Sequence, residues 1–434
     1  MARRFDGFPD VQLNLNVRGV PRSATLAINE RCATMEREGR TVYRLGLGQS
    51  PFPVPVPVVE ALRRNAHQKD YLPVQGLGEL RETIAGQHRD EFGVDCEADD
   101  VLVGPGSKEL MFLLQLVYYG DLVIPTPAWV SYAPQARIIG RHVHLLTTRP
   151  DNGWRLSPDQ LRMLCALDPG RPRIVVLNYP SNPTGGTYSE TELEALAEVA
   201  AANRVVLLSD EIYGRLHHDG EHRSIVPLYP QGTIFSGGLS KWCGAGGWRL
   251  GVFVLPRQMR WLLDAMAAAA SETFTSTSAP IQYAAVRAFE GGPAIDAYLV
   301  QCRRILKGLG AVLTRRLRAG GLDVLDPEGA FYLFPDFGPH LDRLKAAGIT
   351  TSDALCERLL ADTGVAILPG SQFGRPPEEL VARIAYVNFD GEAALSAVRD
   401  LSDDAPVDDA FLTRWCAPTV EAIDRIVGWV EGVG

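Results

Sequence analysis

The chain has 434 residues, of which 46% are hydrophobic and 22% are charged, and its formal net charge is −9. The length allows two domains of the usual size, and the composition is typical of a globular enzyme. The negative net charge argues against nucleic acid and against an anionic membrane surface as partners, because both bind a basic face.

The cysteines and the start of the chain indicate a cytoplasmic protein. The seven cysteines are an odd number, lie far apart and include no CxxC pair, so we expect reduced thiols rather than disulfides or a zinc site. The first 14 residues lack the apolar segment of a signal peptide. No run of about 18 apolar residues is present, so we expect no membrane span. The eight histidines include His142-x-His144 and His217-His218 but no spacing typical of a ligand set, and we expect no metal.

The predicted elements begin with a helix over residues 24–40 and an extended segment, TVYRLGLG. The run PFPVPVP follows, and its four prolines in seven residues exclude a helix and a central strand, so we expect an extended crossing. From about residue 78, helices such as 189–203 alternate with short apolar or β-branched segments that are bounded by turn residues. The expected strands are DDVLVGPGS, DLVIPTP, RHVHLLTT, RIVVLNYP, RVVLLSDEIY, TIFSGGLSK and LGVFVLP.

Short buried strands separated by helices predict an α/β fold with a mostly parallel central sheet flanked by helices. We assign residues 51–310 to this large domain. After a helical stretch over about 281–319, segments such as LDVLDPEGAFYLFPDFG and VARIAYVNF predict a smaller α+β region that ends in a helix over 419–431. We expect residues 1–50 and 311–434 to form this small domain.

Polar residues at the carboxyl ends of the strands are the candidates for chemistry, because ligands bind at that edge of a parallel sheet. Asn182 lies on the turn of LNYPSNPTGG, and Asp210 and Tyr213 follow an apolar strand in LLSDEIYG. Lys241 lies among glycines in SGGLSKWCGAGGWRLG, with Arg249 eight residues later. Any one of these residues alone is most simply explained as a solvated side chain at a strand end.

A further candidate is the glycine turn GPGSKE, where Gly106, Ser107 and Lys108 open a helix. Its spacing fits neither of the nucleotide-binding loops GxGxxG and GxxxxGK[ST]. The free N–H groups and the helix dipole at such a turn nevertheless favour an anion such as a phosphate monoester.

The chain resembles the class I/II aminotransferase family, and within the fold-type I enzymes it is similar to the aspartate aminotransferases. The resemblance lies in the motifs and their order along the chain: SNPTG, then SDEIY, then SK followed by GWRLG. The resemblance extends from 21–29 to 383–389 and includes GLGQSPFPVP, YLPVQGLGELRETIA, PTPAWVSY, PEGAFY and GVAILPGSQFG. It implies the fold of those enzymes, pyridoxal 5'-phosphate as the cofactor, and exchange of an amino group between an L-amino acid and a 2-oxo acid.

The resemblance also implies roles for the residues at the strand ends. Lys241 would hold the cofactor as a Schiff base and then act as the general base that moves the α-proton. Asp210 would keep the pyridinium nitrogen protonated, so that the ring can act as an electron sink. Asn182 and Tyr213 would hydrogen-bond the phenolate oxygen of the cofactor.

The same resemblance places the cofactor phosphate against the backbone of Gly106, Ser107 and Lys108, with Arg249 as its charged partner. Ser240 would add a hydroxyl, and Trp129 would stack on the cofactor ring. Tyr71 resembles a tyrosine that reaches the phosphate of the neighbouring subunit, which implies a homodimer with shared active sites.

For the substrate, Arg383 in VARIAYVNF matches the arginine that grips the α-carboxylate in a bidentate fork, and Gly48 and Asn182 match further substrate-binding positions. Lys108 stands where an acidic-substrate branch of the family carries a lysine that faces the distal carboxylate. We therefore expect aspartate or glutamate as one substrate. The alternative is that Lys108 is only a first-turn residue of its helix.

The chain departs from the family pattern at three places. The helix after GPGSK is short and runs straight to YYGDLVIP, where relatives usually have Asp-Glu after the glycine. Gly238 lies three residues before Lys241, where many relatives carry serine. The residues from about 400 to 418 form an additional segment, of which 402–411 are expected to be an exposed acidic loop.

Other enzymes of this fold remain alternatives, because they share the Schiff-base residues: lyases that make cyclopropane amino acids, β-eliminating lyases and oxidases. A non-catalytic regulator that binds the cofactor is less favoured, because only about 20 residues precede the first family-like segment, too few for a DNA-binding domain.

Overall fold

The computed structural model describes residues 14–20, 24–402 and 405–433. Of the first 14 residues, for which we expect no signal peptide, all but the last lie outside the described residues. The larger part of the structure is built on a seven-stranded sheet with the order β2-β8-β7-β6-β5-β3-β4. The strands are β2 (Val101–Gly104), β3 (Asp121–Thr126), β4 (Val143–Thr147), β5 (Arg173–Asn178), β6 (Val206–Asp210), β7 (Thr233–Gly238) and β8 (Gly251–Val254). Neighbouring strands from β4 to β7 are parallel, and β8 is antiparallel to β7 and β2. The seven expected strands and the mostly parallel sheet are confirmed.

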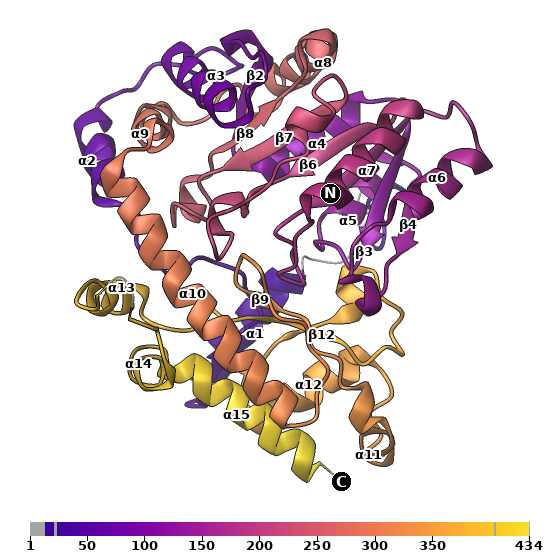
Figure 1. The fold of residues 1–434 in the computed structure, drawn as a ribbon, viewed down its shortest axis with the longest axis vertical. Coiled ribbons are helices and arrows are strands. Elements are labelled where there is room, and N and C mark those ends of the chain that lie inside the picture. The colour runs from indigo at the N-terminus through magenta and orange to yellow at the C-terminus, as the bar shows by residue number, and fades with distance from the viewer. Residues whose placement is uncertain (1–13, 21–23, 403–404, 434) are drawn as a thin grey trace, which may run out of the picture.

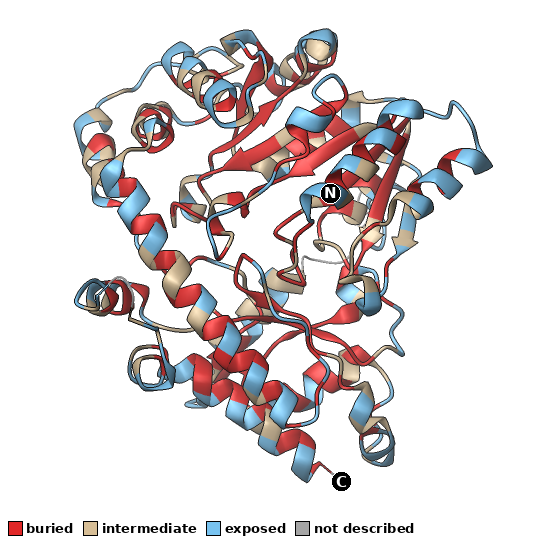
Figure 2. Ribbon diagram, in the orientation of Figure 1, coloured by how far each residue is buried: buried red, intermediate tan, exposed pale blue. Residues whose placement is uncertain are grey.

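Helices cover both faces of this sheet (Figure 1). Along β5, Ile174 and Val176 pack in one apolar cluster with side chains of α4 and α8, whereas Val175 and Leu177 pack in another with side chains of α6 and α7. Successive side chains of a strand point to opposite faces, so β5 is buried on both faces, and Figure 2 shows the inner strands of the sheet as mostly buried. The helices of this part are α2 (Val56–Asn65), α3 (Gly78–Phe92), α4 (Ser107–Val117), α5 (Tyr132–Ile139), α6 (Pro158–Leu167), α7 (Glu190–Ala202), α8 (Arg260–Ser271) and α9 (Ala279–Glu290).

A smaller part lies below the large sheet in Figure 1 and combines the N-terminal segment with the C-terminal segment. A parallel pair joins β1 (Tyr43–Arg44) to β10 (Val365–Ala366), and β11 (Leu368–Pro369), β12 (Ala382–Ala385) and β9 (Tyr332–Leu333) form an antiparallel sheet. Its helices are α1 (Ala24–Arg37), α11 (Leu341–Ala346), α12 (Ser352–Thr363), α13 (Gly391–Arg399), α14 (Asp409–Trp415) and α15 (Ala417–Gly432).

The long helix α10 (Pro293–Ala319) connects the two parts, as Figure 1 shows. It runs without interruption through residue 310, and the proposed domain limits at residues 51 and 310 stay a prediction. The pairing of β1 with β10 nevertheless brings the N-terminal segment against the C-terminal part, because Tyr43 lies opposite Val365.

Two local expectations were wrong. The proline run was expected to be extended throughout, but α2 begins at Val56 with Pro57 in its first turn. Proline is tolerated there because the N–H groups of the first turn have no helical partner. The expected loop over 402–411 ends early, because the Asp408 side chain accepts a hydrogen bond from the N–H of Phe411 and caps α14.

Within the described part of the additional segment, α14 contacts α10, α13 and α15. None of the described helices combines the length and the apolar character needed to cross a membrane.

Candidate active site

A cavity of about 510 Å³ lies between the carboxyl ends of the large sheet and the small part. Its lining residues come from the strand-end loops, from α1, from the N-terminus of α4 and from the small antiparallel sheet. They are Thr25, Leu26, Leu47, Gly48, Gln49, Ser107, Lys108, Trp129, Asn178, Asn182, Asp210, Ile212, Tyr213, Ser240, Lys241, Gly246, Arg249, Tyr332 and Arg383. Of the site residues that the sequence singles out, all except Gly106 and Tyr71 line this cavity. The additional segment contributes no described residue to the lining.

The charge inside the cavity is opposite to that of the whole chain. Lys108, Lys241, Arg249 and Arg383 line it, whereas Asp210 is the one acidic residue among its described lining residues. The four cations surround one carboxylate, so the cavity favours anionic ligands even though the chain carries a net charge of −9.

Lys241 follows the loop after β7 and points into the cavity. Its Nζ donates a hydrogen bond to the carbonyl oxygen of Gly48 at 2.6 Å. Burial and, second, the nearby Arg383 guanidinium lower the pKa of the Lys241 amine to about 7. About half of the amine is therefore neutral near neutral pH, and a neutral amine can act as a nucleophile and as a base.

Asp210 ends β6 and is 3% exposed. Its carboxylate accepts hydrogen bonds from the hydroxyl of Tyr132 at 2.5 Å and from that of Ser236 at 3.3 Å. Burial raises the pKa of Asp210 to about 6. The sequence did not identify Tyr132, because its only signal was its place in the family-like segment PTPAWVSY.

The turn before α4 requires glycine for close approach. Gly106 has φ +91°, and a Cβ there would lie 2.1 Å from Nη2 of Arg249. A Cβ on Gly251 would lie 2.1 Å from the backbone nitrogen of Ser107. The first-turn N–H groups of α4 have no intrahelical acceptor, so this turn and Arg249 could together hold an anion.

The departure at Gly238 also has a steric reason. Gly238 has φ +152°, and a Cβ there would lie 2.7 Å from the carbonyl oxygen of Leu250 and 2.9 Å from Cα of Gly251. The backbone cannot yield as a flexible side chain would, so serine does not fit at this position without a shift of β8.

Arg383 lies on β12 and is 1% exposed. Its Nη1 donates to Oδ1 of Asn182 at 3.0 Å, and its Nη2 donates to the carbonyl oxygen of Gly46 at 2.5 Å. The rings of Tyr332 and Phe373 lie 4.9 Å and 5.0 Å from its guanidinium carbon. The buried Nε has no hydrogen-bond partner, so the guanidinium retains donor capacity toward a ligand.

Lys108 extends over the ring of Trp129, with Nζ 5.2 Å from the ring centre. Burial and, second, Arg249 lower the pKa of Lys108. Tyr71 differs from the other predicted residues, because it lies between α2 and α3, is 90% exposed and does not line the cavity of its own chain.

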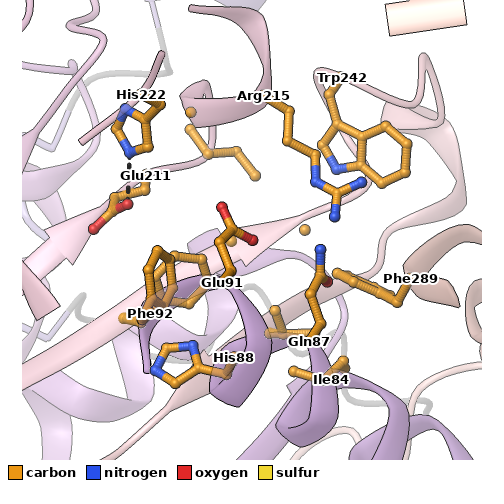
Figure 3. A pocket seen from close by; sticks show the side chains of 16 residues that line it. Ile84, Gln87, His88, Glu91, Phe92, Glu211, Arg215, His222, Trp242 and Phe289 are labelled. Atoms are coloured by element: carbon orange, nitrogen blue, oxygen red, sulfur yellow. Dashed lines mark hydrogen bonds and ion pairs between the residues drawn. The ribbon is translucent and has the colours of Figure 1, made fainter. Parts of the chain in front are cut away.

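A small pocket of about 60 Å³ is lined by residues next to Asp210 at the end of β6 and next to Lys241 after β7 (Figure 3). Glu211 lines it and accepts hydrogen bonds from His222 and Ser224, both at 2.6 Å. Arg215 and Glu91 point into this pocket. The buried contacts of Glu211 anchor the end of β6 and thereby help to hold Asp210 in place.

Asp121, His142 and His144 form a group that the sequence spacing did not reveal, because the carboxylate comes from the neighbouring strand β3. Their ligand atoms all lie within 4.8 Å of one another. Arg171, however, donates to both carboxylate oxygens of Asp121, at 2.8 Å and 3.0 Å. We therefore interpret the group as an ion-pair network.

The comparisons with known proteins agree with this geometry. The model of the family "aminotransferase class I and II" matches residues 40–394. The chain is 34% identical over 386 residues to the aspartate aminotransferase of Geobacillus stearothermophilus, which covers 87% of this chain and 94% of that protein. It is also 34% identical over 367 residues to the aspartate/prephenate aminotransferase of Thermus thermophilus, covering 83% of this chain and 91% of that protein.

Solved structures show the same relationship. The Thermus thermophilus aspartate aminotransferase with maleate superposes with a TM-score of 0.82 and 30% identity, over 96% of this chain and 99% of that one. The Rhizobium meliloti aspartate aminotransferase gives a TM-score of 0.82 and 29% identity, over 98% and 100% of the two chains. The resemblance drawn from the motifs is thus confirmed: the chain belongs to the class I and II aminotransferases, has the fold of the fold-type I enzymes and is a transaminase.

Proposed function

We propose that this aminotransferase holds pyridoxal 5'-phosphate on Lys241 and exchanges the amino group of aspartate or glutamate with a 2-oxo acid. The observation that carries the proposal is the cationic cavity itself. It contains a lysine whose pKa is about 7, one buried carboxylate and a glycine turn for a phosphate.

The residues fit the cofactor at two points. Asp210 is buried and makes no ion pair with any residue that the structure describes, and a protonated ring nitrogen would supply such a partner and lower its pKa again. The α4 turn with Gly106, Ser107 and Lys108 would bind the phosphate together with Arg249, and Ser240 lies on the same wall. When bound, the cofactor supplies a conjugated ring that withdraws electrons from the α-carbon of the amino acid.

The remaining residues orient the substrate and move its proton. Lys241 carries the α-proton as a general base, which requires its neutral form. Arg383 binds the α-carboxylate with the donor capacity that Asn182 and Gly46 leave open. Gly48 lets the substrate approach the backbone, and the Trp129 indole offers a flat apolar wall for a ring.

Lys108 supports an acidic substrate, because its ammonium lines the cavity beside Arg249 and can meet a second carboxylate. The named relatives support the same class, since both are aspartate aminotransferases by name. Lys108→Gln should raise KM for aspartate roughly tenfold and leave KM for a monocarboxylic amino acid within twofold. Lys69→Gln is the control, because Lys69 is an exposed ion-pair lysine.

We propose further that the enzyme is a homodimer in which Tyr71 reaches the phosphate site of the neighbouring subunit. The 90% exposure of this aromatic side chain supports the arrangement, because a partner subunit would cover it. Mixed dimers of a Tyr71→Ala chain and a Lys241→Ala chain should regain activity, because one site then has both residues. Mixtures that stay inactive would contradict the shared site.

The seven free, buried cysteines support a reducing compartment, the cytoplasm.

The decisive experiment is a screen of amino donors and oxo acceptors on the enzyme loaded with pyridoxal phosphate, with products quantified. Transamination predicts one new amino acid for each new 2-oxo acid, with aspartate or glutamate as the preferred donor. Stoichiometric release of ammonia would instead indicate the lyase or oxidase alternatives. A chain that takes up no pyridoxal phosphate would sink the proposal.

A further inference from the structure

Tyr332 lies where the cofactor side and the carboxylate side of the cavity meet. It belongs to β9 in the small part, opposite Ala385 of β12, and is 1% exposed. Its hydroxyl lies 2.7 Å from the hydroxyl of Tyr213, which follows β6 in the large part. Its ring faces the guanidinium of Arg383 at 4.9 Å. The Tyr332 side chain therefore contacts both the Tyr213 hydroxyl and the Arg383 guanidinium.

The packing around Tyr332 fixes its hydroxyl in place. A Cβ on Gly48 would lie 2.0 Å from that hydroxyl oxygen, so glycine is required there. The ring of Tyr332 meets that of Tyr213 edge to face, with centres 5.5 Å apart. Gly48 also accepts the hydrogen bond of the Lys241 amine. A shift of Tyr332 would therefore disturb the contacts of Lys241 as well.

The direction of the hydrogen bond between the two tyrosines follows from counting protons. Burial raises the pKa of both hydroxyls, so both are protonated at neutral pH. Each hydroxyl has one proton to donate and can accept. If Tyr213 donates its proton to an oxygen of the cofactor, Tyr332 must be the donor to Tyr213.

We propose that Tyr332 is a positioning residue with two separable contributions, one from its hydroxyl and one from its ring. The hydroxyl donates to Tyr213 and would strengthen the hydrogen bond that Tyr213 offers to the phenolate oxygen of a bound cofactor. The ring, together with that of Phe373, contacts the Arg383 guanidinium and holds it in the orientation that receives the substrate carboxylate. This inference rests on the proposed use of pyridoxal phosphate.

The first contribution has a spectroscopic signature. In a chain of hydrogen bonds each donor polarises the next, so losing the Tyr332 hydroxyl weakens donation by Tyr213. With weaker donation from Tyr213, the nitrogen of Lys241 would keep its proton to a higher pH when the cofactor is bound. In the loaded enzyme, Tyr332→Phe should therefore raise the midpoint of the pH-dependent absorbance change by roughly 0.3 unit. Its Kd for maleate should stay within twofold of the parent value. An unchanged midpoint would overturn the hydroxyl contribution.

The second contribution is tested by removing the ring. Tyr332→Leu takes away the aromatic face, so its affinity for maleate should fall about fivefold. Calorimetry on the chain without cofactor measures this directly and does not depend on turnover. Affinity equal to that of the parent chain would overturn the ring contribution.

Tyr386 supplies the matched control. It is fully buried and follows β12, but its hydroxyl contacts His218 at 3.5 Å and does not line the cavity. Tyr386→Phe should leave both the absorbance midpoint and maleate binding unchanged; a shift equal to that of Tyr332→Phe would show that any buried hydroxyl has this effect. Failure of the parent chain to take up pyridoxal phosphate refutes the proposed function, whereas normal uptake with variants identical to the parent refutes the role of Tyr332 alone.

Discussion

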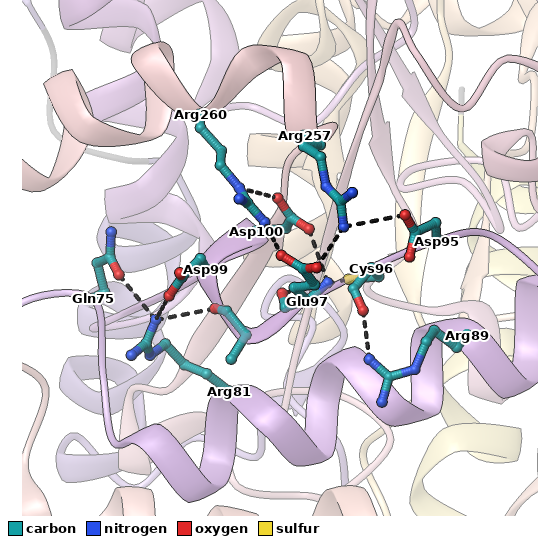
Figure 4. Close-up of polar contacts among 11 residues, drawn as sticks. Gln75, Arg81, Arg89, Asp95, Cys96, Glu97, Asp99, Asp100, Arg257 and Arg260 are labelled. Carbon is teal, nitrogen blue, oxygen red and sulfur yellow. Dashed lines mark hydrogen bonds and ion pairs between the residues drawn. The ribbon is translucent and has the colours of Figure 1, made fainter.

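The two ends of β2 carry charges in opposite arrangements. At the amino end, each charge has a partner: Arg260 binds Asp100 and Glu97, both at 2.7 Å, and Arg257 binds Glu97 at 2.7 Å (Figure 4). At the carboxyl end, Lys108 and Arg249 stand in the cavity beside Lys241 and Arg383, with Asp210 as their one acidic neighbour.

Two kinds of charged side chain are thus distinguished. Those at the amino end of β2 form ion pairs that stabilise the fold, whereas those at the carboxyl end line a cavity that can bind a ligand. The paired group joins α8 to the start of β2, and Arg260 lowers the pKa of Glu97, which shows that the pair favours the ionised form. In the cavity, burial instead lowers the pKa of Lys241 and raises that of Asp210, so both ionised forms are disfavoured. This arrangement favours an anionic ligand. The following predictions test this contrast, from the largest expected effect to the smallest.

Lys241→Ala should reduce transamination by at least about 10³-fold, because the chain loses both its nucleophile and its general base. The phosphate and ring contacts remain, so the variant should still bind pyridoxal phosphate. Borohydride reduction followed by mass spectrometry should label position 241 in the parent chain only. Activity above one hundredth of the parent level would contradict the assignment.

Asp210→Asn should lower kcat roughly 10²-fold, because a neutral amide cannot stabilise a positive charge on the ring nitrogen. Tyr132→Phe removes only the 2.5 Å hydrogen bond to the carboxylate and should have a clearly smaller effect. Steady-state kinetics of both variants, with melting temperatures as the stability control, decide the point. Equal losses in the two variants would mean that the carboxylate charge has no special role.

The rate of cofactor uptake should rise with pH around the Lys241 pKa of about 7. The neutral amine is the reactive form, so the sign is fixed: about a tenth of it is neutral one unit below the pKa and about nine tenths one unit above. Stopped-flow absorbance between pH 6 and pH 8 should therefore show a rise of roughly tenfold. A flat profile would indicate that the amine is not the reacting group.

Arg260→Gln should change turnover less than twofold and reduce the free energy of unfolding by about 1–3 kcal/mol. The loss arises because Asp100 is 1% exposed and would lose its cationic partner. Chemical denaturation measures the stability, and the transamination assay measures the turnover. A large loss of activity without a loss of stability would reverse the distinction between the two ends of β2.

Much of the fold could be read from local patterns. The seven strands of the large sheet are short β-branched or apolar runs between turn residues, and the Ser189–Glu192 capping box marks the start of α7. The proline run misled, because composition does not show that Pro57 falls in a first helical turn, where its missing N–H is harmless.

The candidate site shows the same division. Lys241, Asp210, Asn182 and Arg383 were found because ordered motifs carry them. Tyr132 and Tyr332 were missed as site residues, although PTPAWVSY and PEGAFY both belong to the resemblance, because their hydrogen-bond partners lie 78 and 119 residues away along the chain. The sequence also did not show that Asp121 lies beside His142 and His144, because Asp121 is on β3 and the contact depends on the pairing of β3 with β4.

By itself, then, the sequence determined the class of sheet, the family and the residues with which Lys241 should act, because strand patterns and motifs are local. Only the tertiary structure decided which charges are paired and which face the cavity, why Gly238 admits no side chain, and that Tyr332 touches both Tyr213 and Arg383. Those properties depend on burial and on distances between elements that are remote along the chain, and no local pattern encodes either.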